Sequence, residues 1–408
     1  MPARHKAKPE NDPRQEYVDV AGSRQPVPRV DFNPGLQYAD VNRRFSNVTS
    51  ITRTPGGRLW CGFAGGGEGE GHLNYGLVVF SDDVGLTWTP PQIVFDTDGE
   101  GPIRSDHVVV WTAPDGVLWI MWNQYPEGLG GHRSSTWAIT CANPDADDRK
   151  WTAPRKLVDE QNLLNKPTVL ADGTWIFPTG CWFDDGKDRQ RCRVQCPSRP
   201  LISRDGGKTF EPGGPLHAPE NPDYDEYQII ERADGSLVSF NRHGLKGQPG
   251  KPESEHSILE GESRDGGRTW TEQRPNGIPN ARARLVFMKL QSGAWLLVKH
   301  GDMIRVPVDD PFKGRTRMTA YLSRDEGKTW EGGLMLEERD CAYPDGFQAP
   351  DGTIYVSYDR QRQRQAEMLL ALFTEADVLA GSLVSGRAAL SLMINKTAGI
   401  SREVKANL

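Results

Sequence analysis

Short apolar runs alternate with turns along most of the chain, from about residue 27 to about residue 375. The runs are bounded by Gly, Pro, Asp and Ser, which is the pattern of β-strands joined by tight turns. Six turns separate pairs of such runs, and they end in Gly57, Gly116, Gly173, Gly235, Gly293 and Gly352. Because Asp-Gly between apolar runs is the strongest short-range hairpin signal, these turns predict six β-hairpins.

The spacing of the turns predicts the architecture. Successive turn glycines are 57 to 62 residues apart. A unit of about 60 residues has room for four strands of ordinary length. Four antiparallel strands form one blade of a propeller, and repeated blades close into a ring. The sequence therefore predicts an all-β fold, a six-bladed β-propeller.

A second repeat has the form Ser-x-Asp-x-Gly-x-Thr followed by an aromatic residue. It occurs at residues 81–88, 203–210, 263–270 and 323–330, so one copy near residue 142 is missing or degenerate. In this pattern Asp accepts hydrogen bonds from following backbone N–H groups, Gly supplies a positive φ, and Thr and the aromatic residue fix the turn. The octets follow the glycine turns by about 30 residues, which predicts that they join the two outer strands of a blade.

The two ends of the chain differ from the repeats. Residues 1–26 are rich in Lys, Arg, Pro and Glu, which predicts a flexible arm before a single propeller over residues 27–408. Residues 367–373 predict a strand of the sixth blade, and residues 374–380 predict a short helix near the C-terminus, capped by Thr374. We expect an N-terminal strand to join the last blade, because closing the ring removes exposed edges.

Charge and composition exclude several classes of protein. The net charge of −6 argues against nucleic acid as a partner. No apolar run approaches about 18 residues, so no membrane span is expected. The polar N-terminus lacks the apolar segment of a signal peptide, which predicts a cytoplasmic protein as written, or a secreted one if a leader has been removed.

The six cysteines are Cys61, Cys141, Cys181, Cys192, Cys196 and Cys341. Their scatter is neither a disulfide framework nor a set of zinc ligands, so buried free thiols are expected, with a local pairing of Cys192 and Cys196 as the alternative. The sequence indicates no metal site and no cofactor.

The hairpins predict where a site would lie. The two far ends of a hairpin lie side by side, so six hairpins should bring their far ends to one face of the ring, opposite the turns. The residues at these ends are unusually polar: Asn47, Arg104, Asp106, His107, Asn123, Asn165, Lys166, Trp182, Asp225, Glu226, Arg242, His243, Arg282, Arg284, Lys299, His300, Tyr343, Asp345, Asp359 and Arg360. Convergent polar groups in a concavity are the usual sign of a binding site.

The excess of Arg, Lys and His on this face predicts an anionic ligand, because guanidinium groups match carboxylates. His132 and Arg133 lie in a glycine-containing stretch that predicts a further rim loop. His72 ends the glycine-rich stretch 65–72, which lacks the Lys-Ser/Thr pair and the helix of a phosphate loop. The competing interpretation is that these charges are solvated or form structural ion pairs, such as Glu226 with Arg242.

The octets, their period and the glycine turns resemble the sialidase superfamily, whose six-bladed propellers carry octets called Asp boxes. The resemblance covers about residues 40 to 375. It implies an arginine triad that binds the substrate carboxylate, a tyrosine nucleophile activated by a glutamate, and an aspartic acid as proton donor. Tyr343 matches the nucleophile, Glu226 the activating glutamate, Arg242 one triad arginine, and Arg317 or Arg315 another.

Two positions depart from that pattern. Asn47 stands where the family has the first triad arginine. The loop that carries the acid aspartate reads EGEGHLN over residues 68–74, so Glu68, Glu70 or His72 would have to serve instead. The chain resembles a divergent member that acts on an acidic sugar other than sialic acid.

Three hypotheses follow. The first is a retaining exo-glycosidase in which Glu226 activates Tyr343, Arg242 and Arg317 hold the acid group, and Glu70 or His72 donates the proton. The second is a lyase that cleaves a rhamnose–glucuronate type of linkage with His or Tyr as base and Arg neutralising the uronate, which the histidines, among them His107, favour. The third is a glycan-binding propeller without turnover.

All three predict an acidic oligosaccharide or polysaccharide as partner. The remaining candidates for substrate binding are Arg104, His132, Arg133, Lys166, His243, Arg282, Arg284 and Arg360.

Overall fold

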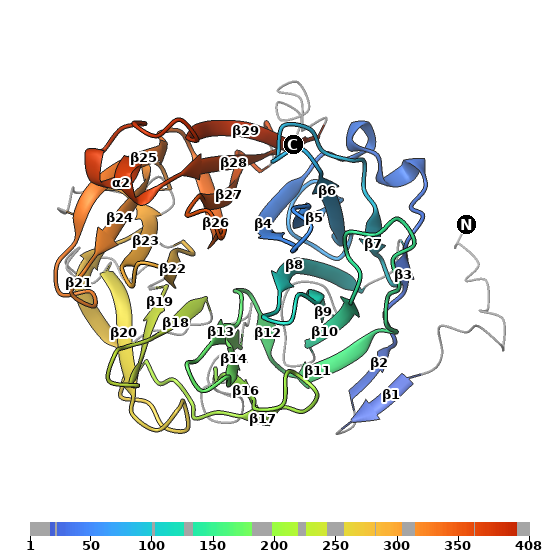
Figure 1. Cartoon of the computed structure of the whole chain (residues 1–408). Coiled ribbons are helices and arrows are strands. Elements are labelled where there is room, and N and C mark those ends of the chain that lie inside the picture. The colour runs from blue at the N-terminus through green and yellow to red at the C-terminus, as the bar shows by residue number, and fades with distance from the viewer. Residues whose placement is uncertain are drawn as a thin grey trace, which may run out of the picture.

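The computed structural model is a six-bladed β-propeller, as the sequence predicts (Figure 1). It describes residues 17–20, 23–99, 103–125, 134–181, 198–218, 226–242, 257–281, 283–303, 315–362 and 364–397. Each blade is an antiparallel sheet with four strands that follow one another in the chain from the centre of the ring outwards, and β3 (Val30–Asp31) adds a fifth strand at the outer edge of blade one. The blades are numbered one to six in chain order.

The strands of each blade have the following bounds. The innermost strands are β4 (Ser46–Arg53), β8 (Arg104–Thr112), β13 (Thr168–Val169), β18 (Tyr227–Glu231), β22 (Val286–Lys289) and β26 (Cys341–Gln348). The second strands are β5 (Leu59–Gly65), β9 (Leu118–Tyr125), β14 (Trp175–Phe177), β19 (Leu237–Asn241), β23 (Trp295–His300) and β27 (Ile354–Arg360). The third strands are β6 (Tyr75–Ser81), β10 (Ser135–Cys141), β16 (Leu201–Ser203), β20 (Ser257–Ser263), β24 (Met318–Ser323) and β28 (Glu367–Phe373). The outer strands are β7 (Ile93–Phe95), β11 (Arg155–Asp159), β17 (Glu211–Pro212), β21 (Arg274–Pro279), β25 (Glu331–Glu337) and β29 (Ala389–Lys396).

A few elements lie outside this scheme. The pair β12 (Asn162–Leu163) and β15 (Thr179–Gly180) forms a small sheet beside blade three. Part of the predicted arm forms a hairpin of β1 (Tyr17–Val20) and β2 (Ser23–Pro26). Two short 3-10 turns, η2 (Leu36–Tyr38) and η3 (Asp40–Asn42), precede β4.

The six glycine turns join the first and second strands of each blade. All six glycines have positive φ, for example 84° at Gly116 and 86° at Gly352, a conformation that other residues adopt only with strain. The glycine N–H donates to the carbonyl three residues earlier, as Gly352 does to Ala349 at 2.9 Å. The hairpins predicted from the sequence are therefore confirmed.

The octets join the third and outer strands, also as predicted. In the copy that follows β20, Asp265 accepts from the backbone N–H of Thr269 at 2.8 Å and from its hydroxyl at 2.6 Å, and Ser263 donates to Asp265 at 2.9 Å. Asn143 takes the place of the aspartate in the degenerate copy of blade two, where it accepts from the N–H of Lys150 at 3.0 Å. In blade six the helix α2 (Glu375–Ala380) replaces the octet, and Thr374 and Asp377 form its capping box.

The octets predict how the stability of the fold depends on acid. Hydrogen bonds from the Thr side chain and backbone lower the pKa of Asp83, Asp205 and Asp325 to about 2. A carboxylate with a depressed folded-state pKa contributes stability above its unfolded pKa of about 4 and loses it as the pH falls towards the folded value. We expect the thermal midpoint to fall steeply between about pH 4 and pH 2, and less steeply in a triple Asp→Asn variant. Circular dichroism melts across this range measure both slopes, and parallel slopes would contradict the assignment.

The prediction for ring closure is wrong. The N-terminal strand β3 (Val30–Asp31) pairs with β7 at the outer edge of blade one, and β29 completes blade six from the C-terminal part of the chain. The blue and red blades in Figure 1 therefore meet without sharing a strand.

Side chains of blade six close the ring. Asp359 accepts from the N–H of Val48 at 3.0 Å, and Asp345 accepts from the hydroxyl of Ser50 and the N–H of Ile51, each at 2.8 Å. Because β29 already pairs with the outer edge of blade six, the N-terminal strand β3 pairs instead with the outer edge of blade one.

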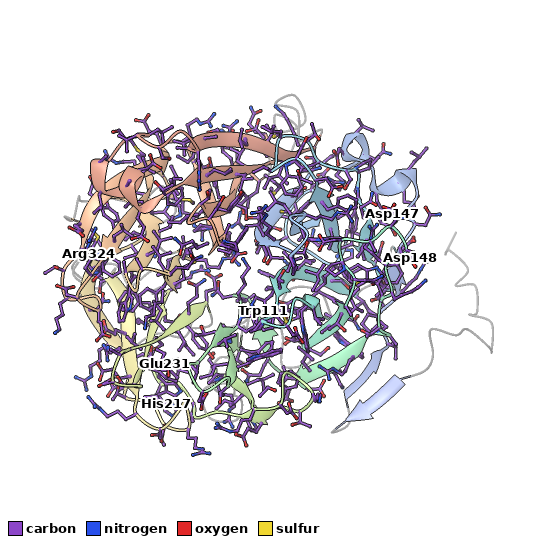
Figure 2. The ribbon with its side chains drawn as sticks, viewed as in Figure 1. Trp111, Asp147, Asp148, His217, Glu231 and Arg324 are labelled. Atoms are coloured by element: carbon purple, nitrogen blue, oxygen red, sulfur yellow. The ribbon has the colours of Figure 1, made fainter. Side chains whose placement is uncertain are left out.

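Apolar clusters fill the spaces between neighbouring blades. One cluster joins Leu296 and Leu322 of blade five to Val356 and Phe373 of blade six. Figure 2 shows side chains throughout the ring, with Trp111 on its inner side and Arg324 at its outer edge.

The cysteines agree with the expectation of buried thiols where they are described. Cys61, Cys141, Cys181 and Cys341 are buried and free. Cys192 and Cys196 lie outside the described residues. In the part of the chain that the structure describes, no helix has the length and apolar character needed to cross a bilayer.

Candidate active site

Three innermost strands carry a β-bulge at the end away from the glycine turns. The pairing register shifts between Asn47 and Ser50 in β4, between Asp106 and Val109 in β8, and between Ala342 and Asp345 in β26. Within each bulge lies a residue with positive φ, namely Val48 at 53°, His107 at 49° and Tyr343 at 50°. Strained backbone of this kind collects at functional sites, where a bulge re-aims a side chain.

Tyr343 is surrounded by arginines. Its side chain is only 7% exposed. The guanidinium carbons of Arg362, Arg315 and Arg284 lie 4.1, 5.4 and 5.5 Å from the centre of its ring. Its hydroxyl oxygen accepts a hydrogen bond from Nη1 of Arg242 at 3.2 Å. Four positive charges around one buried phenol produce a strongly positive environment at the centre of this face.

Glu226 supplies the opposing charge. It lies directly before β18, and its Oε1 accepts from Nη1 of Arg242, the same nitrogen that bonds Tyr343. Burial opposes ionisation, but Arg242 and then Arg284 lower the pKa of Glu226 below its ordinary value. Its Oε2 has no hydrogen-bond partner among the described residues. One guanidinium therefore links the two predicted catalytic residues, and one buried carboxylate oxygen stays available.

Arg315, rather than Arg317, contacts Tyr343. The sequence left the choice between these two arginines open, with Arg317 preferred. Arg317 pairs with Asp302 at 2.9 and 3.1 Å, and its side chain is 54% exposed. Both arginines precede β24, and the positive φ of 54° at Arg317 turns the backbone there, so their side chains contact different partners.

A cavity of about 560 Å³ lies against these arginines. Its walls include Phe45, Glu70, Arg315, Asp359 and Arg362. Burial raises the pKa of Asp359, which is bonded to Arg362 at 3.3 Å. The volume suits a monosaccharide unit, and the cationic wall suits one that carries an acid group.

Arg104, Asp106 and His107 form a second charged cluster on blade two. Asp106 is fully buried and pairs with Nη2 of Arg104 and with Nδ1 of His107, the latter at 2.6 Å. Burial opposes ionisation of Asp106, but Arg104 and His107 lower its pKa below the ordinary value. The bond to Asp106 fixes the orientation of the imidazole ring, as a carboxylate does for a catalytic histidine.

The two candidates from the glycine-rich loop differ. Glu70 accepts hydrogen bonds from Nη1 of Arg362 at 2.8 Å and from Nδ2 of Asn47 at 3.1 Å. Burial opposes its ionisation, but Arg362, Arg104 and His107 lower the pKa of Glu70. This environment holds Glu70 as a carboxylate and disfavours the predicted role as proton donor. His72 is exposed.

Arg284 has a structural position instead of the predicted substrate-binding one. Its guanidinium donates to the carbonyl oxygens of Leu164 at 2.6 Å, Thr49 at 2.7 Å, Tyr343 at 3.1 Å and Pro344 at 3.2 Å. These carbonyls belong to blades one, three and six. Arg284 is 1% exposed, so its donors are used within the centre of the ring.

Lys166 and Arg360 are also occupied by the fold. Lys166 donates to the Asp345 carboxylate at 2.7 Å and to the carbonyl of Gly346 at 3.0 Å. Arg360 donates to Glu367 of the neighbouring strand at 2.6 Å. Both predictions of substrate binding are corrected, since these cations bind partners in the chain itself.

The described residues also line a second cavity in the centre of the ring. Lys166 and Asp345 line this second cavity of about 490 Å³, which follows the inner strands towards the glycine turns. Trp111, labelled in Figure 2, lines this second cavity.

Six residues predicted for this face lie outside the described part of the chain, namely His132, Arg133, Trp182, Asp225, His243 and Arg282. Arg362 was missed by the reasoning from sequence. The hairpin geometry ended at Arg360, but the run DRQRQR over residues 359–364 is an unusual cationic stretch after a strand and was the available signal.

Comparisons with known proteins agree with this architecture. The structure of an intramolecular trans-sialidase from Ruminococcus gnavus, in complex with oseltamivir carboxylate, superposes with a TM-score of 0.59 at 12% identity, covering 84% of this chain and 96% of that one. The Hadza microbial sialidase Hz136 gives 0.57 at 20% identity, covering 78% of this chain and 64% of the sialidase. A protein of unknown function from Dyadobacter fermentans gives 0.58 at 17% identity, covering 80% and 93%. None of the curated protein sequences compared with the chain matches it.

The fold and the octets define a sialidase-like six-bladed propeller. The sequence profile of the BNR repeat-like domain matches residues 57–356, most of the chain. The chain belongs to the BNR repeat-like family.

Proposed function

We propose that the protein is a retaining exo-glycosidase that cleaves a glycosidic bond at an acidic sugar. The observation that carries the proposal is the grouping of Tyr343, Arg242 and Glu226, in which one arginine nitrogen bonds both the phenol oxygen and the carboxylate. The sialidase-like fold supports the same class of reaction.

Tyr343 acts as the nucleophile. Its oxygen attacks the anomeric carbon, its proton passes to the Glu226 carboxylate, and the bond to the leaving oxygen breaks as that oxygen takes up a proton. In the second step water attacks the anomeric carbon and gives its proton to the residue that served as acid, the glycosyl–tyrosine bond breaks, and Glu226 returns the proton to the phenol. A neutral phenol suits this substrate, because a carboxylate nucleophile would meet the charge of the sugar's own acid group.

Arg242 and Arg315 bind the acid group of the sugar. Both contact Tyr343, so a carboxylate held by them lies next to the nucleophile. A planar guanidinium can donate two parallel hydrogen bonds to one carboxylate, which fixes its orientation.

His107 is the proton donor of the proposed mechanism. Glu70 is held as a carboxylate by Arg362, and His72 is exposed and is not among the residues that line the cavity, so neither is well placed as the donor. His107 is oriented by the buried Asp106 and lies on a bulge equivalent to that of Tyr343. Its Nε2 is the ring nitrogen that Asp106 does not bind.

The same histidine keeps the lyase in consideration as a second function. An oriented imidazole can remove the proton next to a uronate carboxylate while arginines neutralise the developing charge. The Asp106–His107 pair is the observation that favours it.

A panel of acidic glycans incubated with the protein tests the proposal. Mass spectrometry of the products should show release of a single acidic sugar with the mass of a hydrolysed unit. An unsaturated product that absorbs ultraviolet light would assign the lyase instead. Intact glycans across the panel would leave binding without turnover, and the proposed function would be rejected.

A further inference from the structure

Arg362 and Asn47 present donors to the same point beside the Tyr343 site. Arg362 comes from the segment after β27 in blade six, and Asn47 comes from β4 in blade one. Arg362 stacks on Tyr343 with its guanidinium carbon 4.1 Å from the ring centre, and it lines the cavity. Asn47 is fully buried. The sequence places Asn47 on the predicted polar face, but the hairpin geometry gives no indication of Arg362 as a ligand-binding residue.

The point where they meet holds a carboxylate of the chain itself. Oε1 of Glu70 accepts from Nη1 of Arg362 at 2.8 Å and from Nδ2 of Asn47 at 3.1 Å. Arg362 also pairs with Asp359 through Nε at 3.3 Å. Its Nη2, although buried, has no hydrogen-bond partner among the described residues. A guanidinium that binds one carboxylate oxygen and keeps a second donor open is half of the two-bond geometry that carboxylates favour.

Glu70 reaches this point from a glycine-rich loop, and its side chain is partly exposed. Five of the seven residues 65–71 are glycine, and Gly66 and Gly67 have φ of 90° and 68°. Asn74 holds the loop backbone on both sides of Glu70, since it donates to the carbonyl of Gly69 at 2.9 Å and accepts from the N–H of Gly71 at 2.8 Å. The Glu70 side chain is still 35% exposed, unlike the buried Asp359 on the other side of Arg362. Removing Glu70 from Arg362 therefore requires only a rotation of the partly exposed Glu70 side chain, while the loop backbone stays in place.

We propose that Arg362 and Asn47 form a carboxylate subsite for the acidic sugar, and that Glu70 occupies it in the ligand-free protein as an internal competitor. The inference rests on the proposed function for the identity of the ligand as an acidic sugar. On binding, the same carboxylate that Arg242 and Arg315 contact also takes the Nη1 and Nη2 donors of Arg362, and the Glu70 side chain turns towards solvent. Glu70 thus sets the affinity of the site.

The test compares Glu70→Gln with Glu68→Gln, a matched control two residues away. Glu68 pairs with Arg44 on the surface at 2.6 Å and is 51% exposed. Isothermal titration is carried out with glucuronate and N-acetylneuraminate as free acidic monosaccharides, and with glucose as the neutral probe. A competitor that fills the subsite nine-tenths of the time weakens apparent affinity about tenfold, so Glu70→Gln should tighten acidic-sugar binding by about that factor. Glu68→Gln should match the wild type, and glucose should show no gain.

Arg362→Gln should weaken acidic-sugar binding, and adding Glu70→Gln to it should restore nothing. If Arg362→Gln melts well below the wild type, the two loop variants decide the question alone. Three results would overturn the subsite. Glu70→Gln and the wild type could bind acidic sugars with equal affinity, or Glu70→Gln could gain as much affinity for glucose as for the acids. The third is that neither protein binds glucuronate or N-acetylneuraminate at all.

These titrations contain no glycosidic bond, so the outcome is separate from turnover. Tighter acidic-sugar binding by Glu70→Gln without cleavage of any glycan would keep the subsite and reject the glycosidase. Tyr343-dependent cleavage with unchanged affinity in Glu70→Gln would do the reverse.

Discussion

Tyr343→Phe is expected to abolish cleavage, with a loss of roughly a thousandfold or more in kcat, because removal of a nucleophile removes the covalent route. The ring that packs under Arg362 and Arg315 is kept in this variant. Only the hydrogen bond from Arg242 is lost, so the free energy of unfolding should fall by about 1 kcal/mol at most. Initial rates on the substrate found by the glycan panel measure the effect.

Tyr355→Phe is the control for this experiment. Tyr355 lies on β27 of the same blade and stacks on Phe347, away from the arginine cluster. It should retain wild-type rates. Cleavage by Tyr343→Phe at a rate close to that of Tyr355→Phe would remove Tyr343 as nucleophile.

Arg284→Met should be the most destabilising of these substitutions. It leaves the carbonyls of Leu164, Thr49, Tyr343 and Pro344 without their shared donor in a buried position. It also removes a positive charge that lowers the pKa of Glu226. Orphaned buried polar groups and broken buried networks cost about 3 to 5 kcal/mol in the free energy of unfolding.

Denaturant unfolding followed by tryptophan fluorescence measures this loss. Arg268→Met is the matched control, because Arg268 is an exposed residue of an octet. Its substitution should change stability by no more than about 0.5 kcal/mol. If both variants unfold at the same denaturant concentration, Arg284 does not hold the centre of the ring.

The parts of the fold that sequence predicts well are those made by local interactions. A glycine turn or an octet needs only a few consecutive residues, so Gly116 or Asp265 can be recognised without knowledge of the rest of the chain. Ring closure depends instead on which strand edge is left free. Because β29 lies after the helix α2, no pattern in the sequence predicts a strand there, and the prediction that an N-terminal strand joins the last blade is therefore wrong.

The same difference between local and long-range interactions applies to the candidate active site. The hairpin geometry places Glu226, Arg242 and Tyr343 at one end of their strands, and the structure brings them together. The bulge at Tyr343 changes the register of β26, and the positive φ of Arg317 turns the backbone before β24, and no residue pattern predicts either feature.

The sequence also could not predict which cationic side chains already bind partners within the protein. Whether Arg284 or Lys166 is available to a ligand depends on carbonyls from other blades. Such contacts between distant segments exist only once the ring has formed. Sequence therefore found the polar face but not which of its charges are already neutralised.

Intact-protein mass spectrometry of the enzyme, quenched with acid during turnover of its acidic glycan, tests the central claim most directly. The account predicts a population heavier by one acidic sugar residue, with the adduct on Tyr343 in the peptide that contains β26 and no adduct in Tyr343→Phe. An enzyme that turns over at the same rate and carries the sugar on another residue, or releases an unsaturated uronide, would contradict it.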